Sequence, residues 1–374
     1  MTAKPRPESP PNKQGRSIWG KVKAMLIGTV VALIILEVFL RIWSPFGARV
    51  QGGKIVLPAG ITYDLKRPEG ANGLDEQIHH SKNSLGFRGP EKPEDWNAAQ
   101  TIVAVGGSTT ECFYLSDGKD WPAQLYAKLH PSHPNLWINN AGLDGHSTFG
   151  HQMLLDDYVA PQKPDYVLLM CGVNDIGIEQ MRSYDADAVG NKGFMAWLAR
   201  NSSIFGTIAN LRRAANARKA GLTHSFVDIK ALPELNLPQD SIDRAVSAQA
   251  SGRAAFGQRV EKLISTCKKA GIKPILVTQA LLWGDTIDPV SGVNLGNRSL
   301  LEGGNGNQRL YVLESYNDVL RKTATQTGTP LIDLAAIMPK STEYFYDAYH
   351  FTNAGAAKVA ALLAPELENL LQNP

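Results

Sequence analysis

A serine, an asparagine and an aspartate–histidine pair stand at places in the chain where they could support acyl transfer. Ser108 follows two glycines at the end of a short apolar run, and Asn174 lies just after another apolar run. Asp347 lies three residues before His350, so its carboxylate can hold one imidazole nitrogen and leave the other free for a serine hydroxyl. Together these residues predict nucleophilic catalysis by Ser108, with His350 as the base.

Each of these features alone favours a simpler interpretation. Two glycines after a buried strand let the backbone turn, and a serine at the start of a helix commonly caps that helix. A single Asp-x-x-His sequence is more often a surface turn than a catalytic pair. Catalysis is favoured because every candidate follows a predicted strand, so that folding would gather them.

Apolar runs that alternate with amphipathic segments predict the elements that position these residues. We expect strands at 101–105, 136–140, 166–171, 275–278 and 331–334, and helices at 118–130, 148–159, 241–270, 309–327 and 354–371. This alternation predicts a three-layer α/β/α sandwich with a five-stranded parallel sheet. Sites in such sheets form at the carboxyl ends of the strands, where the candidate residues stand.

This set of residues resembles the SGNH/GDSL hydrolase superfamily over roughly residues 99–372. The resemblance implies that Ser108, within GGSTT, is the nucleophile, that His350 is the general base and that Asp347 orients it. It implies neither a metal nor a cofactor. The chain departs from the common form at Gly107, where the family has aspartate, and this bears on the local support of the serine loop.

The resemblance also implies an oxyanion hole. The glycine of the family's second block is matched better by Gly145 than by Gly142, and its Gly-x-Asn-Asp block makes Asn174 the side-chain donor beside the Ser108 N–H. An α/β-hydrolase is the nearest alternative serine fold, but its nucleophile lies in G-x-S-x-G. Here residue 110 is threonine and the acid lies three residues from the histidine, which excludes that fold.

Composition excludes several other classes of function. The net charge of +3 is too small to suggest a nucleic-acid partner, and no P-loop or HExxH metal motif is present. Three cysteines are too few for a disulfide framework; Cys112 and Cys171 are expected near the site, packed rather than bonded, although an oxidising compartment would permit a bond. The remaining histidines lack spacings that suggest a metal site: His79, His80, His130, His133, His146, His151 and His224.

The N-terminal region predicts a membrane anchor. Residues 1–23 form a polar, basic tail that we expect to be disordered. Residues 24–43 form a transmembrane signal anchor, of which Ala24–Leu40 is apolar except for Glu37. A cleaved signal peptide is the alternative, but the apolar run is long for one. The basic tail predicts a single-pass inner-membrane protein, with a connector at 44–98 and a catalytic domain at 99–374 on the periplasmic side.

An insertion at about 176–240 interrupts the alternation, because it is too long for an ordinary loop between a strand and a helix. Within it, Trp197–Lys219 has an apolar face and an arginine-rich face. We expect this segment to cover the acyl pocket or to touch the membrane surface; a helix simply packed on the domain is an equal alternative.

The predicted function is a serine esterase that hydrolyses ester-linked acyl groups, such as O-acetyl, on envelope glycans or lipids. One alternative is an O-acyltransferase that modifies a cell-surface glycan with a membrane acyltransferase partner. A second alternative is a non-catalytic binding or scaffold protein on the same fold, against which the complete set of Ser, Asn, Asp and His argues.

Overall fold

The computed structural model describes residues 18–43, 50–51, 54–181, 194–219, 224, 228–300 and 303–372. Its centre is a five-stranded parallel sheet in the order β6-β5-β7-β8-β9. The strands are β5 (Gln100–Gly106), β6 (Leu136–Asn140), β7 (Tyr166–Met170), β8 (Lys273–Val277) and β9 (Leu331–Ile332). In the middle of β5, Ala104 pairs with Asn140 on one side and with Leu168 on the other. The predicted fold class is confirmed.

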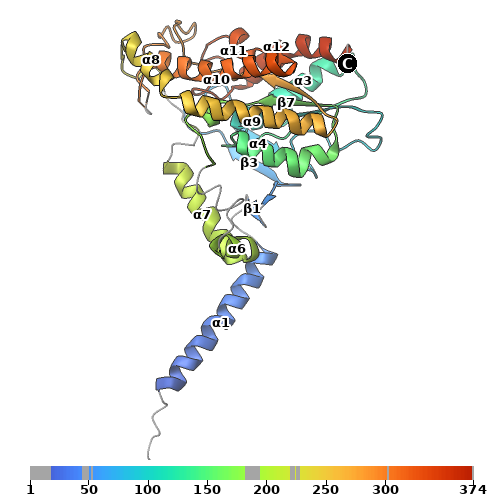
Figure 1. Ribbon diagram of the computed structural model, residues 1–374, viewed down its shortest axis with the longest axis vertical. Coiled ribbons are helices and arrows are strands. Elements are labelled where there is room, and N and C mark those ends of the chain that lie inside the picture. The colour runs from blue at the N-terminus through green and yellow to red at the C-terminus, as the bar shows by residue number, and fades with distance from the viewer. Residues whose placement is uncertain are drawn as a thin grey trace, which may run out of the picture.

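Helices cover both faces of the sheet (Figure 1). One face packs against α3 (Trp121–Leu129), α11 (Leu334–Ile337) and α12 (Asn353–Gln372); the other packs against α4 (Thr148–Leu154), α9 (Ala250–Lys269) and α10 (Gly306–Thr327). Alternate residues of β5 serve the two layers, with Ile102 and Ala104 in one core and Val103 and Val105 in the other. The uncharged run of β5 is therefore explained by burial on both faces.

The prediction of one continuous helix at 241–270 was wrong, and two other segments differ in form from the expectation. The helix expected at 241–270 is α8 (Gln239–Ser247) followed by α9, because the backbone of Gln249 leaves the helical region. The helix expected at 148–159 continues after α4 as a π-helix, Leu155–Val159. The segment Trp197–Lys219 belongs to two helices, α6 (Phe194–Asn201) and α7 (Ser203–Lys219). The carboxylate of Glu37 in the N-terminal helix accepts the first N–H groups of α7.

The stretch expected to be a connector packs closely on the sandwich from residue 54 onward. It contains a short pairing of β1 (Val50–Gln51) with β2 (Lys54–Ile55) and the hairpin of β3 (Thr62–Lys66) with β4 (Gln77–Ser81). Ile55, Leu57 and Phe87 are buried in the same core as Val103. These residues therefore contribute to the core of the sandwich.

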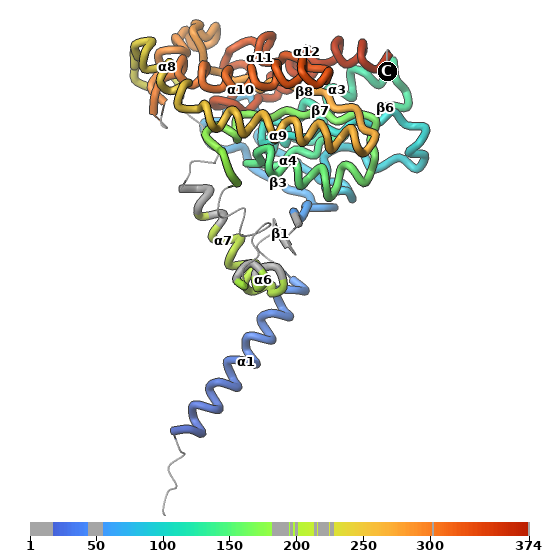
Figure 2. The backbone as a smooth tube through the Cα atoms, in the orientation of Figure 1, coloured from blue at the N-terminus to red at the C-terminus, as the bar shows by residue number. Residues whose placement is uncertain are grey.

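The N-terminal helix α1 (Ile18–Ile42) extends away from the sandwich, and α6 and α7 lie at its junction with the rest of the molecule (Figure 1, Figure 2). It begins at Ile18 rather than at Ala24, and none of its side chains is buried. Of the residues that the structure describes, this is the one helix long and apolar enough to cross a membrane. Residues 1–17 of the expected tail lie outside the described residues.

Candidate active site

Ser108 lies at a tight turn between β5 and the short helix α2 (Ser108–Glu111). Gly106 is required there, because a Cβ at this position would lie 2.1 Å from Thr110 Oγ1 and 2.8 Å from Met170 O. The turn places the Ser108 hydroxyl at the carboxyl end of β5, and Ser108 is only 9% exposed. Little of this serine is therefore accessible from solvent.

Asp347 and His350 reach this serine from the loop that precedes α12. His350 Nε2 lies 2.7 Å from Ser108 Oγ, and His350 Nδ1 lies 2.6 Å from Asp347 Oδ2. The other carboxylate oxygen, Oδ1, accepts the N–H groups of Tyr349 and His350 at 2.9 and 2.8 Å. The loop therefore fixes the carboxylate, the carboxylate fixes the imidazole, and the imidazole contacts the hydroxyl.

The charges of this pair stabilise each other. Burial alone would lower the pKa of His350, but the adjacent Asp347 carboxylate, its hydrogen bond and the nearby Asp144 raise that pKa above its ordinary value of 6.5. Burial would raise the pKa of Asp347, but the His350 charge and the hydrogen bonds lower it below 3.8. The site thus favours an imidazolium beside an ionised carboxylate, which is the charge state formed when His350 accepts a proton.

The expected oxyanion donors gather beside the same turn. A Cβ at Gly107 would lie 2.6 Å from Asn174 Nδ2 and 3.1 Å from His146 O, so the Asn174 amide and the segment that carries Gly145 both approach the serine loop. Asn174 Nδ2 donates to His146 O at 3.0 Å, and Gly145 adopts φ +74°, which favours glycine. The departure at Gly107 has a physical reason in this chain, because a side chain there would displace Asn174.

Asp175, the residue after Asn174, holds the Asn174 loop in place. Asp175 is fully buried, and its carboxylate accepts the Thr148 N–H and hydroxyl and also pairs with Arg259 at 3.2 Å. It therefore ties the Gly172–Asp175 block to the first turn of α4 and to α9. Asp175 is a structural carboxylate that holds the loop of Asn174.

Arg88 supports the serine loop. Its side chain is 1% exposed and donates to the carbonyls of Glu111, Cys112 and Leu115 at 2.7–2.8 Å. Cys112 has φ +50°, a sparsely populated conformation for a residue other than glycine, and Arg88 binds its carbonyl. Arg88 thus holds the C-terminal end of α2.

Lys82 and Glu111 form a second support that the sequence did not indicate. Both side chains are buried, Lys82 Nζ lies 3.1 Å from Glu111 Oε1, and Glu111 Oε2 accepts the Asp144 N–H at 2.5 Å. The pair thus joins the nucleophile helix to the loop that carries Gly145. No sequence signal identifies it, because a lysine and a glutamate 29 positions apart resemble ordinary surface charges.

His224 of the insertion lies directly over the His350 imidazole, which the sequence did not indicate. The ring centroids of His224 and His350 are 4.0 Å apart. His224 Nδ1 lies 2.8 Å from the Tyr346 hydroxyl, Nε2 lies 3.3 Å from the Asp144 carboxylate, and Tyr114 packs edge-on against the ring. These aromatic residues form a roof over the site.

Asp144, His224 and His350 lie close enough together to share a cation. Among the described residues, potential ligand atoms of Asp144, His224 and His350 lie within 4.8 Å of one another. Both ring nitrogens of His350 are already occupied, by Ser108 and by Asp347. A cation would have to displace the serine, so the arrangement fits acyl transfer better than metal binding.

The remaining sequence candidates lie in structural environments. Cys112, Cys171 and Cys267 are free and buried, and burial raises the pKa of Cys112 to about 12, so this thiol stays protonated. Burial lowers the pKa of His80 to about 3 and that of His151 to about 4, which keeps both neutral. These groups are packed in the protein interior rather than poised for reaction.

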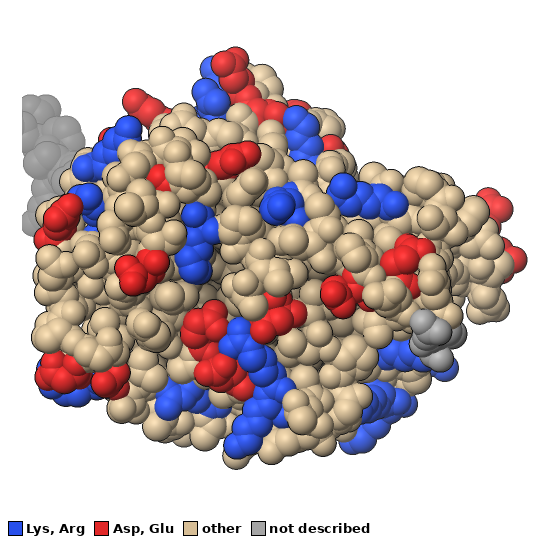
Figure 3. Space-filling model, turned by 90° about the horizontal axis from the view of Figure 1, so that it is seen from above, with Lys and Arg blue, Asp and Glu red and all other residues tan. Residues whose placement is uncertain are grey.

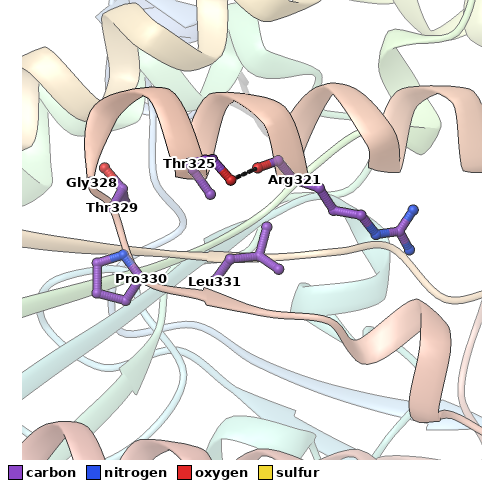
Figure 4. A pocket seen from close by; sticks show the side chains of 7 residues that line it. Arg321, Thr325, Gly328, Thr329, Pro330 and Leu331 are labelled. Atoms are coloured by element: carbon purple, nitrogen blue, oxygen red, sulfur yellow. Dashed lines mark hydrogen bonds between the residues drawn. The ribbon is translucent and has the colours of Figure 1, made fainter.

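A shallow depression of about 480 Å³ lies elsewhere, between the end of α10 and the start of β9 (Figure 4). Arg321, Thr325, Pro330 and Leu331 line it, and Thr325 Oγ1 donates to the Arg321 carbonyl at 3.0 Å. It faces the amino end of β9, whereas Ser108 follows the carboxyl end of β5. The upper face of the molecule shows acidic and basic side chains interspersed (Figure 3).

The fold and the site define an ester-bond hydrolase with a serine, histidine and aspartate at the carboxyl edge of a parallel sheet. The chain belongs to the GDSL-like lipase/acylhydrolase family, whose model matches residues 104–358.

Solved structures with a similar chain path include the acetylxylan esterase Axe2 from Geobacillus stearothermophilus, at 15% identity over 72% of this chain and 94% of that chain, with a TM-score of 0.42. Another is TesA, at 16% identity over 72% of this chain and 99% of that chain, with a TM-score of 0.40. No curated protein matches the chain significantly.

Proposed function

We propose that the chain is a serine esterase in which Ser108 attacks the carbonyl carbon of an acyl ester. His350 Nε2 takes the hydroxyl proton as the Oγ–carbon bond forms, and Asp347 holds the imidazole and stabilises its positive charge. His350 then gives the proton to the leaving alcohol, and an acyl–serine remains. Water deprotonated by His350 releases the acid and restores Ser108. The observation that carries this proposal is the continuous contact from Asp347 through His350 to Ser108, at 2.6 and 2.7 Å.

Three donors are proposed to stabilise the oxyanion that forms on the carbonyl oxygen. These are the N–H groups of Ser108 and Gly145 and the side-chain amide of Asn174. The Ser108 N–H is one of the first of helix α2, so it has no acceptor within that helix. Donors fixed before the reaction stabilise developing charge without a cost of reorganisation, and loss of one typically lowers kcat by about 10²–10³.

The proposed substrate class is a short acyl ester, such as an O-acetyl group, on an envelope glycan or lipid. Ser108 is nearly buried, and His224, Tyr114 and Tyr346 lie close around His350, which leaves little room for a long acyl chain. The helix α1 supports a place at the membrane, with the catalytic domain on the extracytoplasmic side. The same roof could hinder water at the acyl–serine, which is the observation that favours the alternative of an O-acyltransferase.

A fluorophosphonate probe and a short acyl ester test the proposal together. The probe should label the wild-type protein at Ser108, and Ser108→Ala and His350→Ala should each lower turnover by roughly 10³-fold or more. The double variant should be hardly slower than either single one, because the two residues act as a unit. Thr325→Ala, in the distant depression, serves as a control that should retain activity.

Product analysis separates the two chemistries. Free acid released in water supports the hydrolase, whereas acyl groups that appear on an added glycan support the transferase. If a folded Ser108→Ala protein, inactive on the ester, kept the full biological activity of the protein, both enzyme hypotheses would be rejected in favour of a binding protein.

A further inference from the structure

The helices α6 and α7 of the insertion expose an unusual number of large apolar side chains. Phe194 and Trp197 on α6, stacked with ring centroids 6.1 Å apart, and Phe205, Ile208 and Leu211 on α7 are 37–70% exposed. The three α7 residues are spaced three apart, so they lie along one side of the helix. We call these five residues the apolar face of the insertion. Gathered exposed apolar side chains of this kind mark an interaction site in a soluble or membrane-bound protein.

The insertion is fastened to the end of α1 through Glu37. One carboxylate oxygen of Glu37 accepts the Ser203 N–H at 2.8 Å, and the other accepts the Ser202 hydroxyl at 2.7 Å and the Ile204 N–H at 3.1 Å. A carboxylate at the first N–H groups of a helix is favoured by both hydrogen bonding and the helix dipole. Glu37 therefore acts as the N-terminal cap of α7, although it lies 166 positions away in the sequence.

Arg41 completes this junction from the next turn of α1. It pairs with Glu37 at 2.9 Å and donates to the Asn201 carbonyl at the end of α6, also at 2.9 Å. A carboxylate near the hydrocarbon edge of a bilayer is costly unless it is paired and hydrogen-bonded. Here every partner comes from Arg41 or from the α6–α7 junction, so the insertion accounts for the single acidic residue in the apolar run of α1.

This junction fixes the depth of α7 relative to a membrane crossed by α1. The helix α1 is about 37 Å long, somewhat more than the roughly 30 Å of a bilayer core. Glu37 lies about 8 Å before its C-terminal end, and Trp43 follows that end. The start of α7 therefore lies in the outer acyl region, just below the headgroups.

The insertion carries a net positive charge, which favours a position beside anionic phospholipid headgroups. Residues 194–219 contain five basic residues and no acidic one: Arg200, Arg212, Arg213, Arg218 and Lys219. Long basic side chains can reach the headgroups while apolar neighbours enter the acyl region. Basic, partly apolar helices with Trp and Phe are typical of elements that lie in the plane of an anionic membrane surface.

We infer that α6 and α7 lie in the membrane interface, with the apolar face in the outer acyl region, and that the net positive charge of these helices favours anionic phospholipid headgroups. The inference rests on the proposed membrane-crossing role of α1. It gives the insertion a role that the esterase chemistry does not require. The domain is then held on the lipid surface at two points, α1 and the α6–α7 pair, instead of swinging on a single helix.

Lipid quenching of a site-specific fluorophore tests this in the full-length protein reconstituted in vesicles of phosphatidylcholine and phosphatidylglycerol. The native cysteines are buried, so a cysteine introduced at an exposed position takes the environment-sensitive dye NBD selectively. The positions are Ile208→Cys on the apolar face, Phe39→Cys in α1 and Tyr311→Cys on the exposed side of α10. Brominated phospholipid should quench the dye at 208 and at 39 and leave the dye at 311 unquenched.

The outcomes separate the inference from the anchor on which it rests. Quenching at 39 without quenching at 208 would overturn the interfacial insertion and leave the anchor intact. Lack of quenching at 39 would overturn the anchor and the inference together.

A second measurement tests the junction and the headgroup charge. Glu37→Gln should lower quenching at 208 by about twofold or more while quenching at 39 persists, because an uncharged cap binds the α7 N-terminus more weakly. Glu234→Gln, which removes an exposed ion-pair partner of Arg298, is the matched control and should change nothing. Replacing phosphatidylglycerol by phosphatidylcholine should also reduce quenching at 208. Unchanged quenching in both experiments would overturn the proposed junction and the anionic-lipid contact.

Discussion

At the scale of single residues, the central feature is the coupling of His350 to two carboxylates. Asp347 makes direct hydrogen bonds and Asp144 acts through space, and both raise the pKa of His350 against the opposing effect of burial. A general base must be neutral to accept the serine proton. The acid limb of kcat/KM should therefore have its midpoint above pH 6.5.

Asp347→Asn tests whether Asp347 raises the pKa of His350. The substitution removes the larger of the two carboxylate effects, so the acid limb of kcat/KM should move to lower pH while kcat at the plateau falls by about 10⁴. Asp165→Asn, at an exposed carboxylate that accepts the Thr101 N–H at 2.7 Å near the amino end of β5, is the control for an Asp-to-Asn change outside the site and should keep the wild-type midpoint. If the midpoint of the acid limb of kcat/KM is unchanged in Asp347→Asn, a group other than His350 controls that limb.

Gly107 decides whether Asn174 can reach the serine loop. In Gly107→Ala the new methyl would lie 2.6 Å from Asn174 Nδ2, so the amide must move and lose its hold on the His146 carbonyl. We expect kcat to fall by at least about tenfold with KM nearly unchanged, because the donor acts mainly in the transition state. Steady-state kinetics of Gly107→Ala beside Gly28→Ala, where a Cβ meets nothing within 4 Å, provide the measurement. An effect on KM alone would contradict this role.

At the scale of elements, the nucleophile helix α2 is too short to be stable by itself. It has only four residues, and an isolated helix needs several turns to be stable in water. Three neighbours hold it: Arg88 binds the carbonyls at its end, the Lys82–Glu111 pair joins it to the loop of Gly145, and Trp121 of α3 donates to the Thr109 carbonyl at 3.1 Å. The position of Ser108 is therefore a property of the surrounding elements.

The insertion contributes to the site through His224, and this gives a prediction about selectivity. His224→Ala removes the ring that lies over His350, so longer acyl groups should fit beside Ser108. The ratio of kcat/KM for a butyryl ester to that for an acetyl ester should rise by about tenfold, the usual value of one or two methylenes in a pocket. His133→Ala, at a histidine that pairs with Glu368 elsewhere, should leave the ratio unchanged. An unchanged ratio in His224→Ala would show that the roof does not select the acyl group.

At the scale of the whole molecule, α1 and the basic tail predict one membrane crossing with the catalytic domain outside the cytoplasm. A reporter that is active only in the periplasm, fused after Pro374, should therefore be active, and a cytoplasmic reporter at the same place should be silent. The opposite pattern would remove the basis for an envelope substrate. It would leave the proposed chemistry of Ser108 untouched, because the residues that surround Ser108 all lie after α1 in the chain.

Features that depend on local chemistry or on strand order could be predicted from the amino-acid sequence. Runs such as that of β5 are apolar and β-branched because both faces of the sheet are covered, and the alternation of strands and helices fixes a parallel sheet. Asp347 and His350 are close enough in sequence for one turn to join them. Ser108 and Asn174 each follow a strand, so parallel pairing brings them to one edge. Their neighbourhood was predictable for this reason.

Only the tertiary structure decided which charged and aromatic residues serve the site. Arg88, the Lys82–Glu111 pair and His224 resemble ordinary loop residues in the sequence. The partner that makes their burial favourable lies far along the chain, as it does for Glu37 and the start of α7. A buried charge or a stacked ring is stabilised by groups that surround it in space, and one sequence carries no periodicity that reveals such a group. The supports of the nucleophile and the roof over it therefore became visible only when the chain was folded.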